Sequence, residues 1–149
     1  MIFRLEKLLS VALAIAILVA LGWIGYLTAT PNPNEKFTEF YILGPEGKAE
    51  NYPEQALLSS DVYVTVGVVN REYQPATYRV MITVSGVKSE EIAIGTLAHE
   101  QKWERQISFV AQSVGNRQEV EFWLYKDDKV EPYLQDPLRL YIDVMSPES

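Results

Sequence analysis

An uninterrupted apolar run near the amino terminus constrains this chain more than any other feature. From Leu8 to Leu27 the sequence reads "LLSVALAIAILVALGWIGYL", which is 20 residues without a charged side chain. As a helix that rises roughly 1.5 Å per residue, this run is about 30 Å long, the thickness of the hydrocarbon core of a bilayer. The run therefore predicts one transmembrane helix over residues 8–27.

The charges on the two sides of this run predict its orientation. Arg4 and Lys7 precede it, whereas no basic residue follows it before Lys36. Because positively charged flanks stay in the cytoplasm, we expect residues 1–7 to form a cytoplasmic tail and the rest of the chain to lie outside the membrane. A cleaved secretory signal is the alternative, but its apolar region usually has only about 7–15 residues. We expect a retained helix that anchors a single-pass membrane protein.

The segment after the helix, residues 28–36, has the composition of a linker. It contains "TATPNPN", in which Pro31 and Pro33 favour the extended polyproline II conformation. This segment is expected to hold the following domain just clear of the lipid headgroups.

The remainder of the chain is acidic and lacks cysteine. Removing Arg4, Lys7 and Glu6 from the totals of 13 basic and 20 acidic residues leaves 11 and 19, a net charge of −8. Such a surface repels nucleic acid and anionic headgroups, so we expect no nucleic-acid partner. Without cysteine the domain must be held together by its apolar core alone.

Apolar and polar residues alternate in five segments beyond the linker, which is the pattern of half-buried β-strands. The apolar rows are Val62, Val64, Val66, Val68; Tyr78, Val80, Ile82, Val84; Trp103, Ile107, Phe109; Val120, Phe122, Leu124; and Leu138, Leu140, Ile142, Val144. Residues 37–43 and the segment "EEIAIGTL" bring the expected number of strands to about seven. Arg105 interrupts the row of Trp103, which predicts a place at a sheet margin.

Short alternating strands separated by turn clusters are typical of one fold class. The sequence predicts an all-β domain over residues 37–146, an immunoglobulin-like antiparallel β-sandwich, followed by a short tail at residues 147–149. Other small β-folds with the same number of strands remain possible at this point.

Three stretches carry a resemblance to a known family. They are "FTEFYILGPEGKAENYP", "VGVVNREYQPATYRVMI" and "ISFVA" with the later "EVEFWLYKDD" and "LRLYIDV". They resemble the carboxy-terminal extracytoplasmic part of an uncharacterised, mainly archaeal family of predicted membrane proteins, known only as a domain of unknown function. The resemblance implies the sandwich and its location outside the membrane, and it brings no activity or catalytic residue with it.

The polar motifs do not form a catalytic or cofactor site. The glycines of the loop "GPEGKAENYPEQ" lack the spacing of a phosphate-binding loop, and its acidic residues lack the periodicity of a calcium-binding loop. The loop is therefore expected to be a structural crossover in which Tyr52 and Pro53 pack on the sandwich. His99, the only histidine, is expected to be an exposed loop residue, and Asp127 and Asp128 are expected in a turn. We therefore expect a protein that is not an enzyme and needs no cofactor or metal.

The best candidate surface follows from the alternation of side-chain direction along the strands. If Val120, Phe122 and Leu124 point into the core, their neighbours in the sequence point out, and the same holds on two further strands. Large exposed apolar side chains with a polar rim are typical of partner surfaces. The candidate partner-binding residues are Trp123, Tyr141, Met81 and Tyr125, with Arg79, Arg139 and Glu121 at the rim. The alternative is that these side chains only stabilise the sheet through cross-strand contacts.

Three classes of function follow from this reading. The first, which requires no specific sequence motif, is an anchored module that binds another envelope protein or a cell-wall component. The second is a pilin-like filament subunit, although "RLEKLLS" lacks the glycine or alanine of a processing site. The third is a carbohydrate-binding or hydrolytic domain, in which Trp123 and Tyr141 stack on sugar rings beside Glu121 or Asp143.

Overall fold

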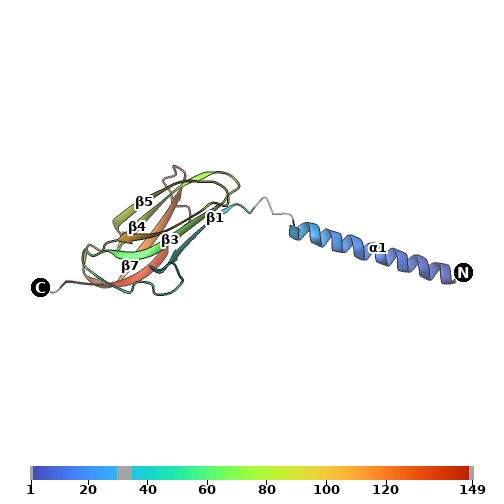
Figure 1. Ribbon diagram of the computed structural model, residues 1–149, viewed down its shortest axis with the longest axis horizontal. Helices are drawn as coiled ribbons and strands as arrows, with labels where there is room; N and C mark the ends of the chain where they lie inside the picture. Colours follow the sequence, from blue (N-terminus) through green and yellow to red (C-terminus); the bar gives the residue numbers. More distant parts are fainter. Residues whose placement is uncertain (1, 30–34, 148–149) are drawn as a thin grey trace. The chain divides into compact units, whose positions relative to one another are not determined.

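The computed structural model describes residues 2–29 and 35–147. It divides the chain into two compact units at the boundary between Glu35 and Lys36. The first unit is a helix and the second is a β-sandwich (Figure 1). Residues 30–34 of the predicted linker and residues 148–149 of the predicted tail lie outside the described residues.

The helix α1 runs from Ile2 to Ala29 and is longer than the predicted span of residues 8–27. Its segment Arg4–Trp23 is long and apolar enough to cross a membrane. Apolar residues occupy every side of this segment rather than one stripe, which suits a helix that is surrounded by hydrocarbon.

The second unit consists of two facing sheets with eight strands among residues 35–147. The strands are β1 (Phe37–Leu43), β2 (Gln55–Leu57), β3 (Val62–Arg71), β4 (Ala76–Val84), β5 (Val87–Leu97), β6 (Lys102–Phe109), β7 (Gly115–Lys126) and β8 (Leu138–Met145). One sheet has the order β1-β3-β6, and the other has the order β2-β8-β7-β4-β5. This arrangement confirms the predicted β-sandwich.

The core lies between the two sheets and is built from the predicted apolar rows. Val64, Val66 and Val68 of β3 are fully buried, as are Val80 and Ile82 of β4. Across the interior, the rings of Phe109 and Phe122 meet edge to face with their centroids 6.0 Å apart. Each of the two rings comes from a different sheet, so this contact ties the layers together.

A buried polar network closes the end of the sandwich at which β1 begins. Glu72 is 5% exposed, and its carboxylate accepts hydrogen bonds from the hydroxyls of Tyr133 (2.9 Å) and Thr38 (3.2 Å). Lys126 lies 3.4 Å from the other carboxylate oxygen. The Thr38 hydroxyl also shares a 2.7 Å hydrogen bond with that of Tyr78. The network joins β1, β4, β7, the turn after β3 and the connection from β7 to β8.

One strand was not predicted, and its pairing differs from the expected antiparallel pattern. β2 has only three residues, too few to show an alternation, and it pairs with β8 in parallel. The loop before it, residues 44–54, crosses from the three-stranded to the five-stranded sheet, as predicted. Tyr52 packs against β1 through a 3.0 Å hydrogen bond from its hydroxyl to the carbonyl oxygen of Ile42.

The predictions about Arg105, His99 and the pair Asp127 and Asp128 have different outcomes. Arg105 is exposed on β6, an edge strand of its sheet, which confirms the predicted margin. His99 lies in the turn before β6, but it is half-buried rather than exposed, because its ring stacks on that of Tyr73 at 4.4 Å and its Nδ1 accepts a hydrogen bond from the Tyr73 backbone N–H. Asp127 and Asp128 occupy a turn after β7, as predicted.

Candidate functional site

A shallow groove of about 320 Å³ lies on the outer face of the five-stranded sheet. Its centre is the pair Met81 and Trp123, which are direct cross-strand partners on β4 and β7. Both side chains are half-buried. The groove is lined by Met81, Thr83, Gly86, Glu121, Trp123, Tyr125 and Pro132.

The alternation of the two strands brings these side chains to one surface. Val80 and Ile82, the neighbours of Met81, are fully buried in the core, and so are Phe122 and Leu124, the neighbours of Trp123. Because successive side chains of a strand point to opposite faces, Met81 and Trp123 must point outward. The predicted alternation of side-chain direction along β4 and β7 is therefore confirmed.

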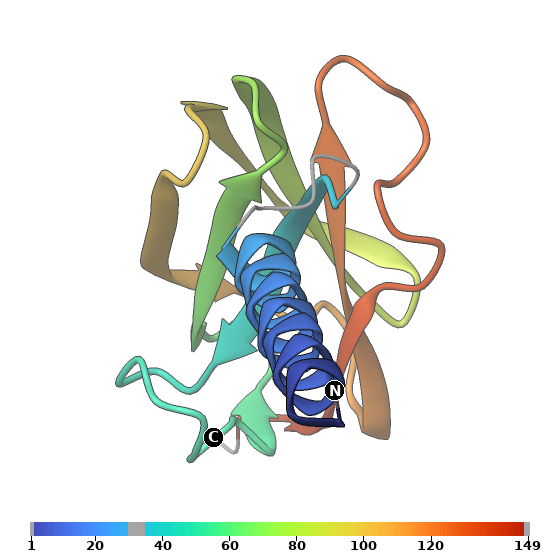
Figure 2. The same ribbon diagram turned by 90° about the vertical axis from the view of Figure 1, so that its right-hand side faces the viewer.

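Two loops form the ends of the groove. Gly86 belongs to the tight turn between β4 and β5, where Ser85 and Gly86 both have positive φ, at 50° and 80°. That combination is typical of a two-residue type I′ hairpin, in which glycine adopts positive φ without strain. Pro132 comes from the long connection between β7 and β8, which Figure 2 shows in orange to red beyond the strand ends.

Arg79 holds this long connection against the sheet instead of projecting freely from the rim. Its guanidinium lies 4.0 Å from the ring centroid of Tyr125 and donates hydrogen bonds to Glu91 (3.1 Å) and to the backbone carbonyl of Lys129 (3.2 Å). Tyr125 is only 8% exposed and forms part of the floor. Through these contacts Arg79 and Tyr125 shape the groove.

Charges at the margin of the groove are unevenly paired. Hydrogen bonds from Lys88 and then from Arg79 lower the pKa of Glu91, the cross-strand neighbour of Met81, so Glu91 remains ionised. Arg139 forms its ion pair with Glu119, at 2.6 Å, although Glu121 is its direct neighbour across the strands. Among the described residues, the carboxylate of Glu121 has no hydrogen-bond or ion-pair partner. The groove thus carries one unpaired carboxylate beside Trp123.

Tyr141 does not join the Met81 and Trp123 pair, which corrects the predicted continuous stripe. It is exposed on β8, but the register places it opposite Glu119, two residues before Glu121. The guanidinium of Arg117 lies 5.3 Å from its ring centroid. The alternation of side chains along a strand predicts the face on which a side chain lies, but not its register against the neighbouring strand. The offset of Tyr141 from Trp123 along the sheet was therefore not predicted.

The crossover loop of residues 44–54 does not line this groove. Its Tyr52 borders a separate depression beside Phe40, Ile42 and Leu140. Pro132 lines the groove together with Trp123 instead, and it was not predicted because a proline in an irregular loop carries no periodic signal.

No cluster of three or more histidine or acidic side chains that could hold a metal ion occurs among residues 2–29 and 35–147. The groove presents an aromatic ring, a thioether and a carboxylate whose side chain has no hydrogen-bond or ion-pair partner among the described residues.

Comparison with solved structures shows the fold. The CARDB domain of the PF1109 protein from Pyrococcus furiosus is similar in its solution NMR structure, with a TM-score of 0.51 and 12% identity over 73% of this chain and 96% of that domain. Its crystal structure, in complex with di-metal ions, gives a TM-score of 0.49 and 12% identity over 76% of this chain and 96% of that domain. A beta-glucosidase from Listeria innocua, in complex with glucose, gives a TM-score of 0.38 and 12% identity, and the match covers 72% of this chain and 16% of the enzyme.

A comparison with curated proteins finds no match. A family model does match, over residues 31–143, and its description is "Domain of unknown function (DUF1616)". The match covers nearly the whole sandwich and confirms the resemblance to an uncharacterised family. The archaeal distribution and the membrane topology that this resemblance implied stay predictions. The chain belongs to the DUF1616 family, whose sandwich here resembles a CARDB domain.

Proposed function

We propose that this protein is a single-pass, membrane-anchored module whose extracytoplasmic β-sandwich binds another envelope protein through the groove at Met81 and Trp123. The observation that supports this function best is the pair itself. A half-exposed tryptophan and methionine lie side by side on the outer face of the five-stranded sheet, beside a carboxylate without a side-chain partner among the described residues.

The chemistry of the groove favours a particular kind of protein partner. An apolar side chain would fill the depression between Met81, Trp123 and Pro132. A lysine or arginine next to it would pair with Glu121, which has no ion-pair partner in the described part of this chain. Tryptophan, methionine and arginine are the residue types that interfaces favour at their centres. The partner segment is therefore expected to combine an apolar anchor with a flanking basic residue.

The anchor is proposed on the length and the flanks of α1. Its apolar segment is long enough to span a bilayer, and the basic residues Arg4 and Lys7 precede most of it. A retained helix keeps the sandwich at the membrane surface, where the effective concentration of other anchored proteins is high. Neither role requires a catalytic group, and we propose that the protein is not an enzyme.

Photo-crosslinking in native membranes tests this function. A benzoylphenylalanine in place of Trp123 is expected to give one discrete crosslinked species. The same group in place of Val114, an exposed residue outside the groove, serves as the control. Crosslinking at both positions to the same degree, or at neither, would remove the groove as a partner site.

A further inference from the structure

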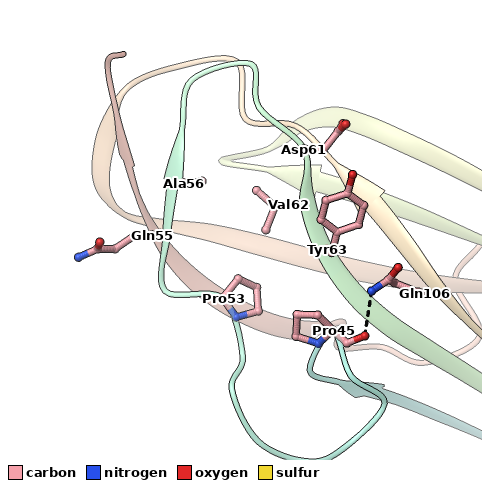
Figure 3. Close-up of a pocket in the computed structure, with 8 residues that line it drawn as sticks. All are labelled: Pro45, Pro53, Gln55, Ala56, Asp61, Val62, Tyr63 and Gln106. Carbon is pink, nitrogen blue, oxygen red and sulfur yellow. Dashed lines mark hydrogen bonds between the residues drawn. The ribbon is translucent and has the colours of Figure 1, made fainter. Parts of the chain in front are cut away.

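A second cavity, of about 370 Å³, lies at a different place in the sandwich and has a different chemistry. Figure 3 shows it between the crossover loop with its short strand β2 and the beginning of β3. It shares no lining residue with the groove at Trp123. Its volume lies at the lower end of the range of roughly 300–1,000 Å³ that is usual for small-molecule sites.

Part of the lining of this cavity is apolar. It consists of the rings of Pro45 and Pro53, Ala56 of β2 and the buried Val62. In Figure 3 the two prolines lie next to each other below Tyr63. The aromatic ring of Tyr63, a residue that is 46% exposed, adds a flat face to this apolar surface.

Polar side chains also line this cavity. Figure 3 shows the hydroxyl end of Tyr63 directed to the side on which Asp61 lies, while Gln55 points away from the other labelled residues. Neither the Asp61 carboxylate nor the Tyr63 hydroxyl has a hydrogen-bond or ion-pair partner among the described residues. Their capacity for hydrogen bonding is therefore available to a ligand.

Gln106 supplies a third polar group in a fixed orientation. Its Nε2 donates a 2.9 Å hydrogen bond to the backbone carbonyl of Pro45, at the base of the crossover loop. This bond directs the side-chain amide and leaves its Oε1 free to accept a hydrogen bond. The site thus combines one carboxylate, one hydroxyl and one oriented amide.

The charge of the cavity limits its ligand. No lysine, arginine or histidine lines it, and Asp61 contributes a negative charge. A phosphorylated or carboxylated ligand would meet repulsion without a compensating cation. A cationic ligand would need its charge close to the carboxylate, but Asp61 is exposed and stays solvated, which weakens such an ion pair. A neutral ligand with an apolar face and a polar edge fits best.

We propose that this cavity binds a neutral hexose unit of a cell-envelope glycan. A pyranose ring has a face of C–H groups, which would pack on the Tyr63 ring and the two prolines. Its equatorial hydroxyls would donate to the Asp61 carboxylate and the Gln106 carbonyl oxygen, and accept from the Tyr63 hydroxyl. This site is independent of the groove at Trp123, so either proposal can fail without the other.

Saturation-transfer NMR on the full-length chain in lipid nanodiscs tests the proposal, with maltose, cellobiose and α-1,2-mannobiose as probes and no glycoside detergent present. At least one disaccharide is expected to bind saturably and to receive saturation mainly at its C–H protons. Tyr63→Ala is expected to weaken binding at least about tenfold, and Asp61→Asn to weaken it as well. Tyr63→Phe keeps the ring and is expected to retain most of the binding.

Phe37→Ala is the control, because Phe37 is an aromatic residue that is 43% exposed and lies outside the cavity. The proposal is overturned if no disaccharide binds saturably, or if Phe37→Ala weakens binding as much as Tyr63→Ala does. It is also overturned if an arginine-containing peptide perturbs Tyr63 and the sugars do not, since the cavity would then be a site for cations.

Discussion

The side chain of Tyr41 on β1 lies across Gly67 on β3, in the space that a side chain at Gly67 would need. The two residues are cross-strand partners, and Glu104 of β6 is the partner of Gly67 on its other side. The Tyr41 hydroxyl donates a 2.7 Å hydrogen bond to the Glu104 carboxylate. One aromatic side chain therefore spans the three strands of this sheet and covers the backbone that glycine leaves bare.

Replacing Gly67 by alanine is expected to destabilise the sandwich by about 1–3 kcal/mol. A Cβ at this position would collide with the Tyr41 ring, and the ring would have to move off β3 and lose its bond to Glu104. Urea denaturation of the full-length chain in detergent, followed by near-ultraviolet circular dichroism, measures the change in the free energy of unfolding.

The double variant Gly67→Ala with Tyr41→Ala is the control for this explanation. Without the Tyr41 ring the new methyl group has room, so the cost of Gly67→Ala should fall clearly in the double-mutant cycle. An unchanged cost in the Tyr41→Ala background would show that the glycine is required for a reason other than the ring.

Removal of the Glu72 side chain is expected to cost about 3 kcal/mol of unfolding free energy. Glu72→Ala leaves Lys126, whose side chain is 14% exposed, without its carboxylate, and leaves the hydroxyls of Tyr133 and Thr38 without their acceptor. Glu121→Ala is the matched control, since the Glu121 carboxylate has no hydrogen-bond or ion-pair partner among the described residues, and its effect should stay within about 0.5 kcal/mol. Equal effects of the two substitutions would contradict the stabilising role of the network.

The same network predicts a loss of stability at alkaline pH. Burial, with a contribution from Glu72, raises the pKa of the Tyr78 and Tyr133 hydroxyls above their usual value of about 10. The folded state therefore holds these protons when the unfolded state releases them. The contribution is fully present below about pH 10 and is lost as the pH rises through the pKa values of the folded state.

Thermal unfolding of the full-length chain between pH 8 and pH 11 measures this dependence. The midpoint is expected to fall above about pH 10. Tyr133→Phe removes one of the two titrating groups, so the variant should be less stable at pH 8 but lose less between pH 10 and pH 11. A wild-type midpoint that is constant through this range would contradict the prediction.

The alternation of apolar residues was sufficient to predict most of the sandwich, because rows such as Val64, Val66 and Val68 can be buried only as one face of a strand. It could not reveal β2, whose three residues are too few to establish an alternation and whose pairing with β8 depends on the long crossover loop. The Glu72 network was also missed, since its members are far apart in the sequence and meet only after folding.

The candidate groove was predictable in part, again from the alternation of side chains along the strands. This alternation placed Met81 and Trp123 on one outer face, and their direct pairing follows once β4 and β7 are neighbours. The position of Tyr141 depends on the register of β8 against β7, and that of Pro132 on the path of an irregular loop. Neither has a local signal in the sequence.

The most direct test of the central claim compares the accessibility of the groove in cells with that in the purified protein. The chain contains no cysteine, so Met81→Cys introduces a unique thiol into the groove and Val114→Cys introduces one outside it. Both are treated with a membrane-impermeant maleimide, on intact cells that express the protein natively and again after purification. If an envelope protein covers the groove, Met81→Cys reacts much more slowly in cells than after purification, while Val114→Cys reacts equally fast in both. Equal rates for Met81→Cys in the two settings would contradict the partner site, and a lack of reaction at Val114→Cys in cells would contradict the extracytoplasmic location.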